Sequence, residues 1–199
     1  RLENQLYRVE IHNGEDIKNS GDINNVPAHV TFKWSRDNGS VVFAIDEFIT
    51  DSNNSPTNEV KVKQLGKDKT LSVGNWVEVL DDVMELNGKS GELVHITDIS
   101  EQTIKLSTAV PISDMKYHPR IRLWDMKNGS RSIVPPQGFE SIELDEDGIY
   151  VRFSGTSFKA GDYWLIPART ATENTQETGK IEGPLDENEQ PKAMPSDGI

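Results

Sequence analysis

The chain has 199 residues, no cysteine, and 33 acidic against 21 basic side chains, which gives a formal net charge of −12 at pH 7. The absence of cysteine excludes disulfides, thiolate metal sites and cysteine nucleophiles, and so acidic a surface disfavours nucleic acid as a partner because it repels phosphate. The longest purely apolar run, Val41–Ile45, is far too short to span a membrane.

Short segments with alternating apolar and polar residues follow one another from the N-terminus onward. Because the chain begins at Arg1 with neither Met nor a signal-peptide pattern, we expect a processed product or part of a longer polypeptide. Residues 5–12 place Tyr7, Val9 and Ile11 on one face of a predicted strand, and residues 29–34 place Lys33 opposite the apolar face of the next. Similar segments recur up to residue 168, and no stretch has a sustained helical period. The pattern predicts an all-β fold, with antiparallel hairpins forming a barrel or a sandwich.

Asn-Gly and Asp-Gly pairs separate these segments at short intervals. They are Asn13-Gly14, Asn38-Gly39, Asn87-Gly88, Asn128-Gly129 and Asp147-Gly148. Asn-Gly accepts the positive φ angles of a type I′ turn, whose twist matches that of two paired strands. We therefore expect hairpins at these positions.

One of these turns occurs twice within a longer phrase. Trp34 precedes Asn38-Gly39-Ser40, and Trp124 precedes Asn128-Gly129-Ser130 with the same spacing. The simpler interpretation is two hairpins, each anchored by an indole in the core. The alternative is a platform on which Trp34 and Trp124 stack against sugar rings, which requires at least one indole to be exposed.

The predicted all-β domain comprises residues 1–171. One segment within it and one segment after it differ from the rest of the chain. Residues 70–108 have the strand order of a small SH3-like barrel, and the fold analogy says nothing about a ligand. Residues 172–199 contain seven acidic residues, three prolines and few large apolar side chains. We expect this segment to be an extended acidic arm or linker that docks on a protein partner or on a second copy of the chain.

No motif for catalysis or for a cofactor stands out. The stretch from Glu143 to Ser154 matches part of a calcium-binding EF-hand loop but lacks its final glutamate. The acidic loop beginning at Asp51 is a second candidate, for weak calcium binding. For both loops, a solvated turn without calcium is the simpler interpretation. The histidines are scattered, and no two have metal-ligand spacing. Because carboxylates are abundant, a hydrolase with a pair of catalytic carboxylates stays open as an alternative.

Five phrases give the sequence a resemblance to a known family. LENQLYRVEIH, TFKWSRDNGSVV, VGNWVEVLDD, HPRIRLWD and GDYWLIPART resemble, in this order, an uncharacterised bacterial family catalogued as a domain of unknown function. The resemblance covers roughly Leu2 to Thr172. It implies a domain of a larger protein associated with phage-tail or contractile-injection components, in a cytoplasmic assembly or at a particle or cell surface. It supplies no catalytic residues.

We therefore expect a non-enzymatic structural or binding module of a bacterial or phage-tail-like assembly, without a cofactor, a metal or a membrane span. A carbohydrate-binding or adhesive domain is the first alternative, and a hydrolase with an acidic pair is the second.

Overall fold

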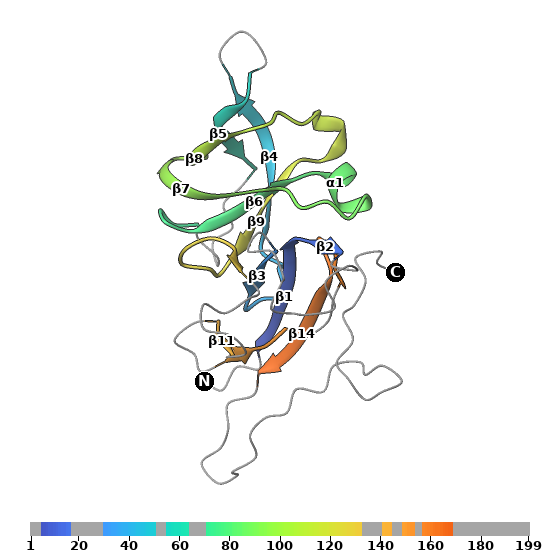
Figure 1. Cartoon of the computed structure of the whole chain (residues 1–199). Helices are drawn as coiled ribbons and strands as arrows, with labels where there is room; N and C mark the ends of the chain where they lie inside the picture. The colour runs from blue at the N-terminus through green and yellow to red at the C-terminus, as the bar shows by residue number, and fades with distance from the viewer. Residues whose placement is uncertain are drawn as a thin grey trace.

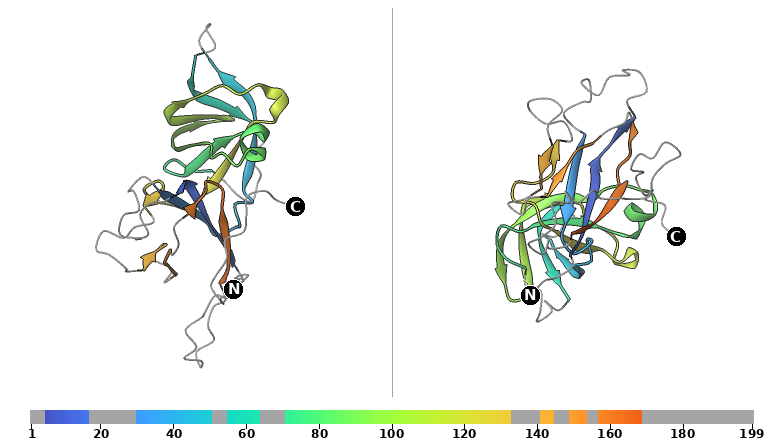
Figure 2. Two further views of the ribbon diagram at one scale, coloured as in Figure 1. Left: turned by 45° about the vertical axis from the view of Figure 1, so that its right-hand side comes forward. Right: turned by 90° about the horizontal axis from the view of Figure 1, so that it is seen from below.

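A computed structural model describes residues 5–16, 30–50, 55–63, 71–132, 141–144, 149–153 and 157–168. Strands dominate this part of the chain, and the all-β prediction is confirmed (Figure 1). Two bodies make up the fold, a closed barrel and a four-stranded sheet, with the barrel stacked on one end of the sheet (Figure 2).

The barrel contains six antiparallel strands in the order β4-β5-β8-β7-β6-β9, and β9 closes it by pairing with β4. Strands β5 to β8 form a Greek key, since β6, β7 and β8 are successive neighbours and β5 lies beside β8. The strands are β4 (Val42–Ile49), β5 (Thr57–Val62), β6 (Trp76–Leu80), β7 (Glu92–Ser100), β8 (Thr103–Val110) and β9 (Arg120–Trp124).

Alternating side chains fill the barrel. Val60 and Val62 of β5 are fully buried, while Lys61 between them is partly exposed, as the sequence pattern predicts. Every strand contributes apolar side chains to one cluster, among them Phe43, Val77 and Ile121. This interior is packed and gives the barrel its own core.

The sheet has the strand order β10-β3-β1-β14. Its strands are β1 (Gln5–Asn13), β3 (Thr31–Ser35), β10 (Arg131–Ser132) and β14 (Tyr163–Ala168). A second cluster covers one face of the sheet and includes Tyr7, Phe32 and Ile142. The opposite face carries polar residues of β1 and β3, and Lys33 on this face contacts Glu78 of β6 in the barrel.

Four short strands and two short helical segments complete the described structure. β2 (Glu15–Asp16) pairs with β13 (Ser157–Phe158), and β11 (Ile142–Glu143) pairs with β12 (Tyr150–Val151). Helix α1 (Asp82–Leu86) connects β6 to β7, and η2 (Met115–Tyr117) precedes β9. Within the described residues, no helix is long and apolar enough to cross a membrane.

The small barrel unit predicted over residues 70–108 corresponds to half of the closed barrel. It supplies β6, β7 and β8, which pair in that order, whereas β4, β5 and β9 come from outside it. The barrel therefore extends from Val42 to Trp124. The predicted arm, residues 172–199, and residues 51–54 of the loop that begins at Asp51 lie outside the described residues.

Three of the five glycine pairs do not lie in the hairpins expected of them. Asn87-Gly88 lies after α1 in the connection between β6 and β7, which do pair. The strands β11 and β12 also pair, although residues 145–148 between them, which include Asp145 and Asp147-Gly148, lie outside the described residues. In contrast, Asn13-Gly14, Asn38-Gly39 and Asn128-Gly129 each separate strands that belong to different sheets. At these three positions the hairpin prediction is wrong.

Candidate functional site

The two copies of the repeated tryptophan phrase are the two connections between the sheet and the barrel. The first crossover, residues 36–41, leads from Trp34 at the end of β3 into β4. The second crossover, residues 125–130, leads from Trp124 at the end of β9 into β10. The repeat thus marks the entry to the barrel and the exit from it.

The two crossovers are hydrogen-bonded to each other. The Asp125 amide donates to the Trp34 carbonyl at 3.0 Å, and the Arg36 amide donates to Oδ2 of Asp125 at 2.7 Å. In the first crossover, Asn38 and Gly39 both have positive φ, 55° and 63°, so the predicted turn geometry is present although no hairpin follows. The crossovers therefore fix how the two bodies meet.

Trp34 and Trp124 are both buried, with 2% and 1% of their surface exposed. The predicted platform for sugar rings at these two residues is incompatible with that burial, because neither indole face is open to a ligand. The Trp124 indole Nε1 instead donates to Oε2 of Glu78 at 2.9 Å. Both side chains act as structural anchors where the crossovers begin.

A buried charge cluster joins the sheet to the barrel. We call Glu10 of β1, Lys33 of β3 and Glu78 of β6 the junction cluster. Lys33 Nζ lies 2.6 Å from Oε1 of Glu78 and 3.1 Å from Oε1 of Glu10, and its side chain is fully buried. The ammonium also lies 4.6 Å from the ring centre of Trp124.

Further hydrogen bonds complete the pairing of the two carboxylates. The Gly91 amide donates to Oε1 of Glu78 at 2.8 Å. Arg8 donates through Nε to Oε2 of Glu10 at 2.6 Å, and its guanidinium lies over the ring of Tyr163. Burying a charge is costly unless it is paired and hydrogen-bonded. Every member of the junction cluster meets that condition, and the Lys33–Glu78 pair connects the two bodies.

The junction keeps its charges in fixed states. Burial alone would raise the pKa of Glu78, but the adjacent Lys33 charge and hydrogen bond outweigh it and hold that pKa below its usual range. Burial lowers the pKa of His12 to about 4, and the Lys33 charge acts in the same direction. At neutral pH, Glu78 is ionised and His12 is neutral.

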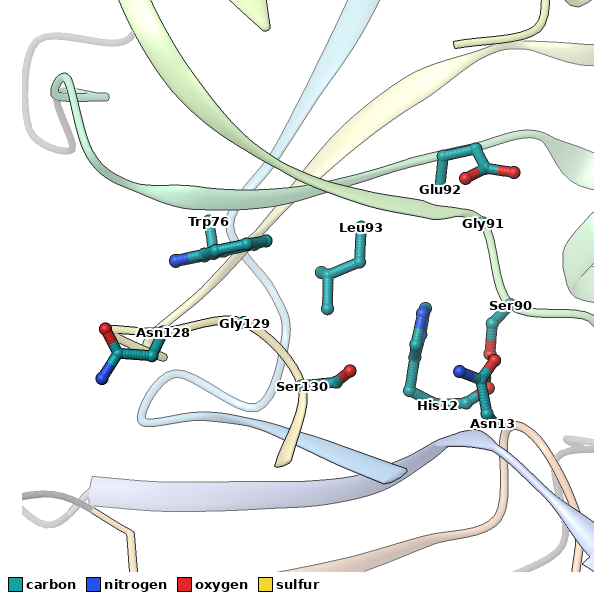
Figure 3. Close-up of a pocket in the computed structure, with 10 residues that line it drawn as sticks. All are labelled: His12, Asn13, Trp76, Ser90, Gly91, Glu92, Leu93, Asn128, Gly129 and Ser130. Atoms are coloured by element: carbon teal, nitrogen blue, oxygen red, sulfur yellow. Dashed lines mark hydrogen bonds between the residues drawn. The ribbon is translucent and has the colours of Figure 1, made fainter. Parts of the chain in front are cut away.

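A groove of about 460 Å³ opens beside the junction cluster, and we call it the junction groove (Figure 3). Residues from the end of β1, from β6, from the start of β7 and from the second crossover line it. They are His12, Asn13, Trp76, Ser90, Gly91, Glu92, Leu93, Asn128, Gly129 and Ser130. The His12 imidazole rises from β1 between Ser90 and Ser130 (Figure 3).

A second groove of about 290 Å³ lies on the other side of Ser90 and carries three carboxylates, those of Glu10, Glu78 and Glu85. For Glu85, burial acts to raise the pKa, but the Arg122 charge and hydrogen bond, helped by Arg120, lower it overall. A general acid of a glycosidase needs a raised pKa. Neither Glu78 nor Glu85 therefore has the raised pKa of such a general acid, and the hydrolase alternative stays a prediction.

A charge network with partly exposed carboxylates lies around α1. We call Asp82, Glu85, His118, Arg120 and Arg122 the α1 cluster. Asp82 accepts from Arg120 at 2.7 Å and contacts His118 Nδ1 at 2.6 Å, while Glu85 pairs with both arginines. The hydrogen bonds from His118 and then from Arg120 lower the pKa of Asp82.

Across the described ranges, no group of three or more histidine and carboxylate side chains is arranged to hold a metal ion. Sequence reasoning assigned no functional role to the junction cluster or to His12 and Trp76 of the junction groove. The available signal was the presence of Glu10 and Lys33 in the first two predicted strands. Alternation alone assigned both side chains to the solvent-facing side.

Comparisons with known proteins give one match. No curated protein and no solved structure matches the chain. A family model described as a family of unknown function (DUF6519) matches residues 1–198. The chain therefore belongs to this family of unknown function.

Proposed function

We propose that the chain is a non-enzymatic structural or binding module of a larger bacterial assembly of the phage-tail-like kind. The observation that carries the proposal is the junction between the two bodies. Two hydrogen-bonded crossovers and a buried ion-pair cluster hold the barrel and the sheet in one relative orientation. A rigid two-body unit suits a protein whose surfaces must meet partners at fixed angles.

An edge strand of the described sheet offers a way to join a neighbour. Among the described strands, β14 ends the sheet order and pairs with β1 on one side. Pro167 within it is typical of an edge strand, because proline cannot donate to a sheet ladder. Residues 172–199 follow β14 closely in sequence, so we propose that this acidic segment docks on a neighbouring copy or partner by strand addition.

Deleting residues 172–199 tests this role. We expect the shortened chain to fold normally and to lose self-association or partner capture, measured by light scattering and by pull-down from a lysate of the source cells. A full-length chain with residues 172–199 in scrambled order is the matched control for length and charge. An unchanged oligomeric state and unchanged partner capture after deletion would contradict the proposal.

A further inference from the structure

The junction groove has the size and position of a ligand site. Its volume of about 460 Å³ falls within the usual range for small-molecule pockets. It lies where four separate segments converge between the two bodies, so its walls depend on the junction that fixes their orientation (Figure 3). The second copy of the repeated Asn-Gly-Ser phrase, Asn128 to Ser130, forms one wall.

One lining residue, His12, carries a polar atom that is buried without a partner among the described residues. His12 is 8% exposed, and within the described structure its Nδ1 has no hydrogen-bond partner. A buried polar atom without a partner carries a free-energy cost that a ligand can remove. Because His12 is neutral at neutral pH, its Nδ1 either donates or accepts a hydrogen bond. A hydroxyl group can satisfy either form, since it both donates and accepts.

The other groups around the groove fit a neutral ligand better than an ion. Asn13 and Asn128 offer amides, and Ser130 offers a hydroxyl. The Ser90 hydroxyl already donates to the His12 carbonyl at 2.6 Å, so it can only accept from a ligand. Glu92 is the one charged side chain among the described lining residues at neutral pH. No lysine or arginine is among them, so a phosphate or carboxylate ligand would lack a counter-charge and would face Glu92. Amides, hydroxyls and a carboxylate together suit the alternating donors and acceptors of a sugar.

Trp76 and Leu93 supply the apolar part of the wall. The Trp76 Nε1 donates to the Lys127 carbonyl at 3.1 Å, which fixes the indole relative to the second crossover. Its six-membered ring packs against Gly129, where an added side-chain carbon would lie 3.0 Å from the ring. The remaining partly exposed surface of Trp76 can contact the C–H groups of a sugar.

We propose that the junction groove binds a neutral carbohydrate unit, with His12 and Asn128 donating to or accepting from its hydroxyls and Trp76 contacting its apolar surface. This inference stands apart from the role proposed for residues 172–199, because none of the lining residues lies in that segment.

The test is a titration of the ¹⁵N-labelled full-length chain with glucose, galactose, mannose, N-acetylglucosamine and their neutral disaccharides. We expect at least one of them to shift amide signals of Asn13, Gly91 and Gly129 in a saturable manner. In the Asn128→Ala and His12→Ala variants, the dissociation constant should rise about fivefold or more, as expected for the loss of a hydrogen bond. Asn128 is exposed, so its replacement should leave the fold intact.

His118→Ala is the matched control, because it removes a histidine of the α1 cluster that does not line the groove. The dissociation constant of this variant should equal that of the wild type. The proposal is overturned if none of the sugars shifts the groove signals, or if the Asn128→Ala and His118→Ala variants bind equally well. Binding of glucose 6-phosphate or of an extended neutral peptide, without binding of the sugars, would also overturn it.

Discussion

The junction cluster and the α1 cluster contain the same kinds of charged groups in opposite surroundings. In the junction cluster, the Lys33 side chain is 0% exposed and that of Glu78 is 3% exposed. In the α1 cluster, the Asp82 and Glu85 side chains are 39% and 38% exposed. Water can replace a lost partner at α1 but not at the junction. Burial, rather than the number of ion pairs, therefore decides which cluster holds the fold together.

The largest effect should come from breaking the junction cluster. Glu78→Gln leaves the buried Lys33 with Glu10 as its one remaining counter-charge within the described structure and weakens the acceptor of the Trp124 indole. We expect a loss of about 3–5 kcal/mol in the free energy of unfolding, measured by urea denaturation.

A paired replacement is the control for this variant. Lys33→Met with Glu78→Gln removes both charges at once and leaves Glu10 paired with Arg8. The glutamine oxygen still accepts from Gly91 or from Trp124, so this double variant should be more stable than Glu78→Gln alone. If Glu78→Gln costs less than about 1 kcal/mol, the junction cluster is not the main link between the two bodies.

Acid should weaken the junction through His12. Its pKa is lowered from 6.5 to about 4 in the folded chain, so the unfolded chain takes up the proton first as the pH falls. Stability should be complete above pH 6.5 and should decrease by up to about 3 kcal/mol as the pH approaches 4. Below pH 4.5, Glu78 also lowers the stability, because its pKa is lower in the folded chain and the unfolded chain takes up the proton first.

Urea unfolding at pH 7, 5.5 and 4.5 measures this slope. In His12→Gln the stability should change much less between pH 6.5 and 4.5, whereas His118→Gln, which alters the exposed cluster, should keep the wild-type slope. Equal slopes in wild type and His12→Gln would show that His12 is not the group responsible.

A smaller effect is expected where the second crossover meets Trp76. Gly129 has a φ of 79°, and an added side-chain carbon would lie 3.0 Å from the Trp76 ring. Gly74 has a similar φ of 89°, but an added carbon would have no neighbour within 4 Å. Both alanine variants should lose about 1–2 kcal/mol from backbone strain.

The difference between these two variants isolates the contact with the ring. Gly129→Ala should be the less stable of the two in thermal unfolding, and it should also weaken sugar binding because Trp76 must shift. Identical melting temperatures would mean that the Trp76 ring moves away from the added carbon without a loss of stability.

The smallest effect should come from the α1 cluster. Glu85→Gln removes the carboxylate that pairs with Arg122 and one of the two that pair with Arg120, which keeps Asp82. The Glu85 side chain is 38% exposed, so water can take its place. We expect a change of at most about 1 kcal/mol in the free energy of unfolding, and less still at high salt, which screens exposed pairs. A loss as large as that of Glu78→Gln would remove the distinction between the two clusters.

The sequence was sufficient to predict the strands and the buried indoles, because alternation and turn residues are local signals. It failed at the junction for a physical reason. Alternation in β3 assigned Lys33 to a solvent face, yet that face is covered by the barrel, and Lys33 is buried as deeply as Phe32. Which body covers a polar face depends on contacts between residues far apart in the chain, here Lys33 and Glu78.

The repeated tryptophan phrase illustrates the same limit. Its spacing predicted the turn at Asn38-Gly39, and both φ angles agree. A turn of this kind does not specify whether the next strand pairs with the previous one or enters another sheet. The junction groove was missed for the same reason, because His12, Trp76 and Asn128 meet only once both crossovers are formed.

A double-mutant cycle on Lys33 and Glu78 tests the central claim most directly. Urea unfolding of the wild type, Lys33→Met, Glu78→Leu and the double variant gives the coupling energy between the two side chains. A coupling of about 2 kcal/mol or more would agree with a buried ion pair that joins the sheet to the barrel. Single effects that add to within about 0.5 kcal/mol would contradict it.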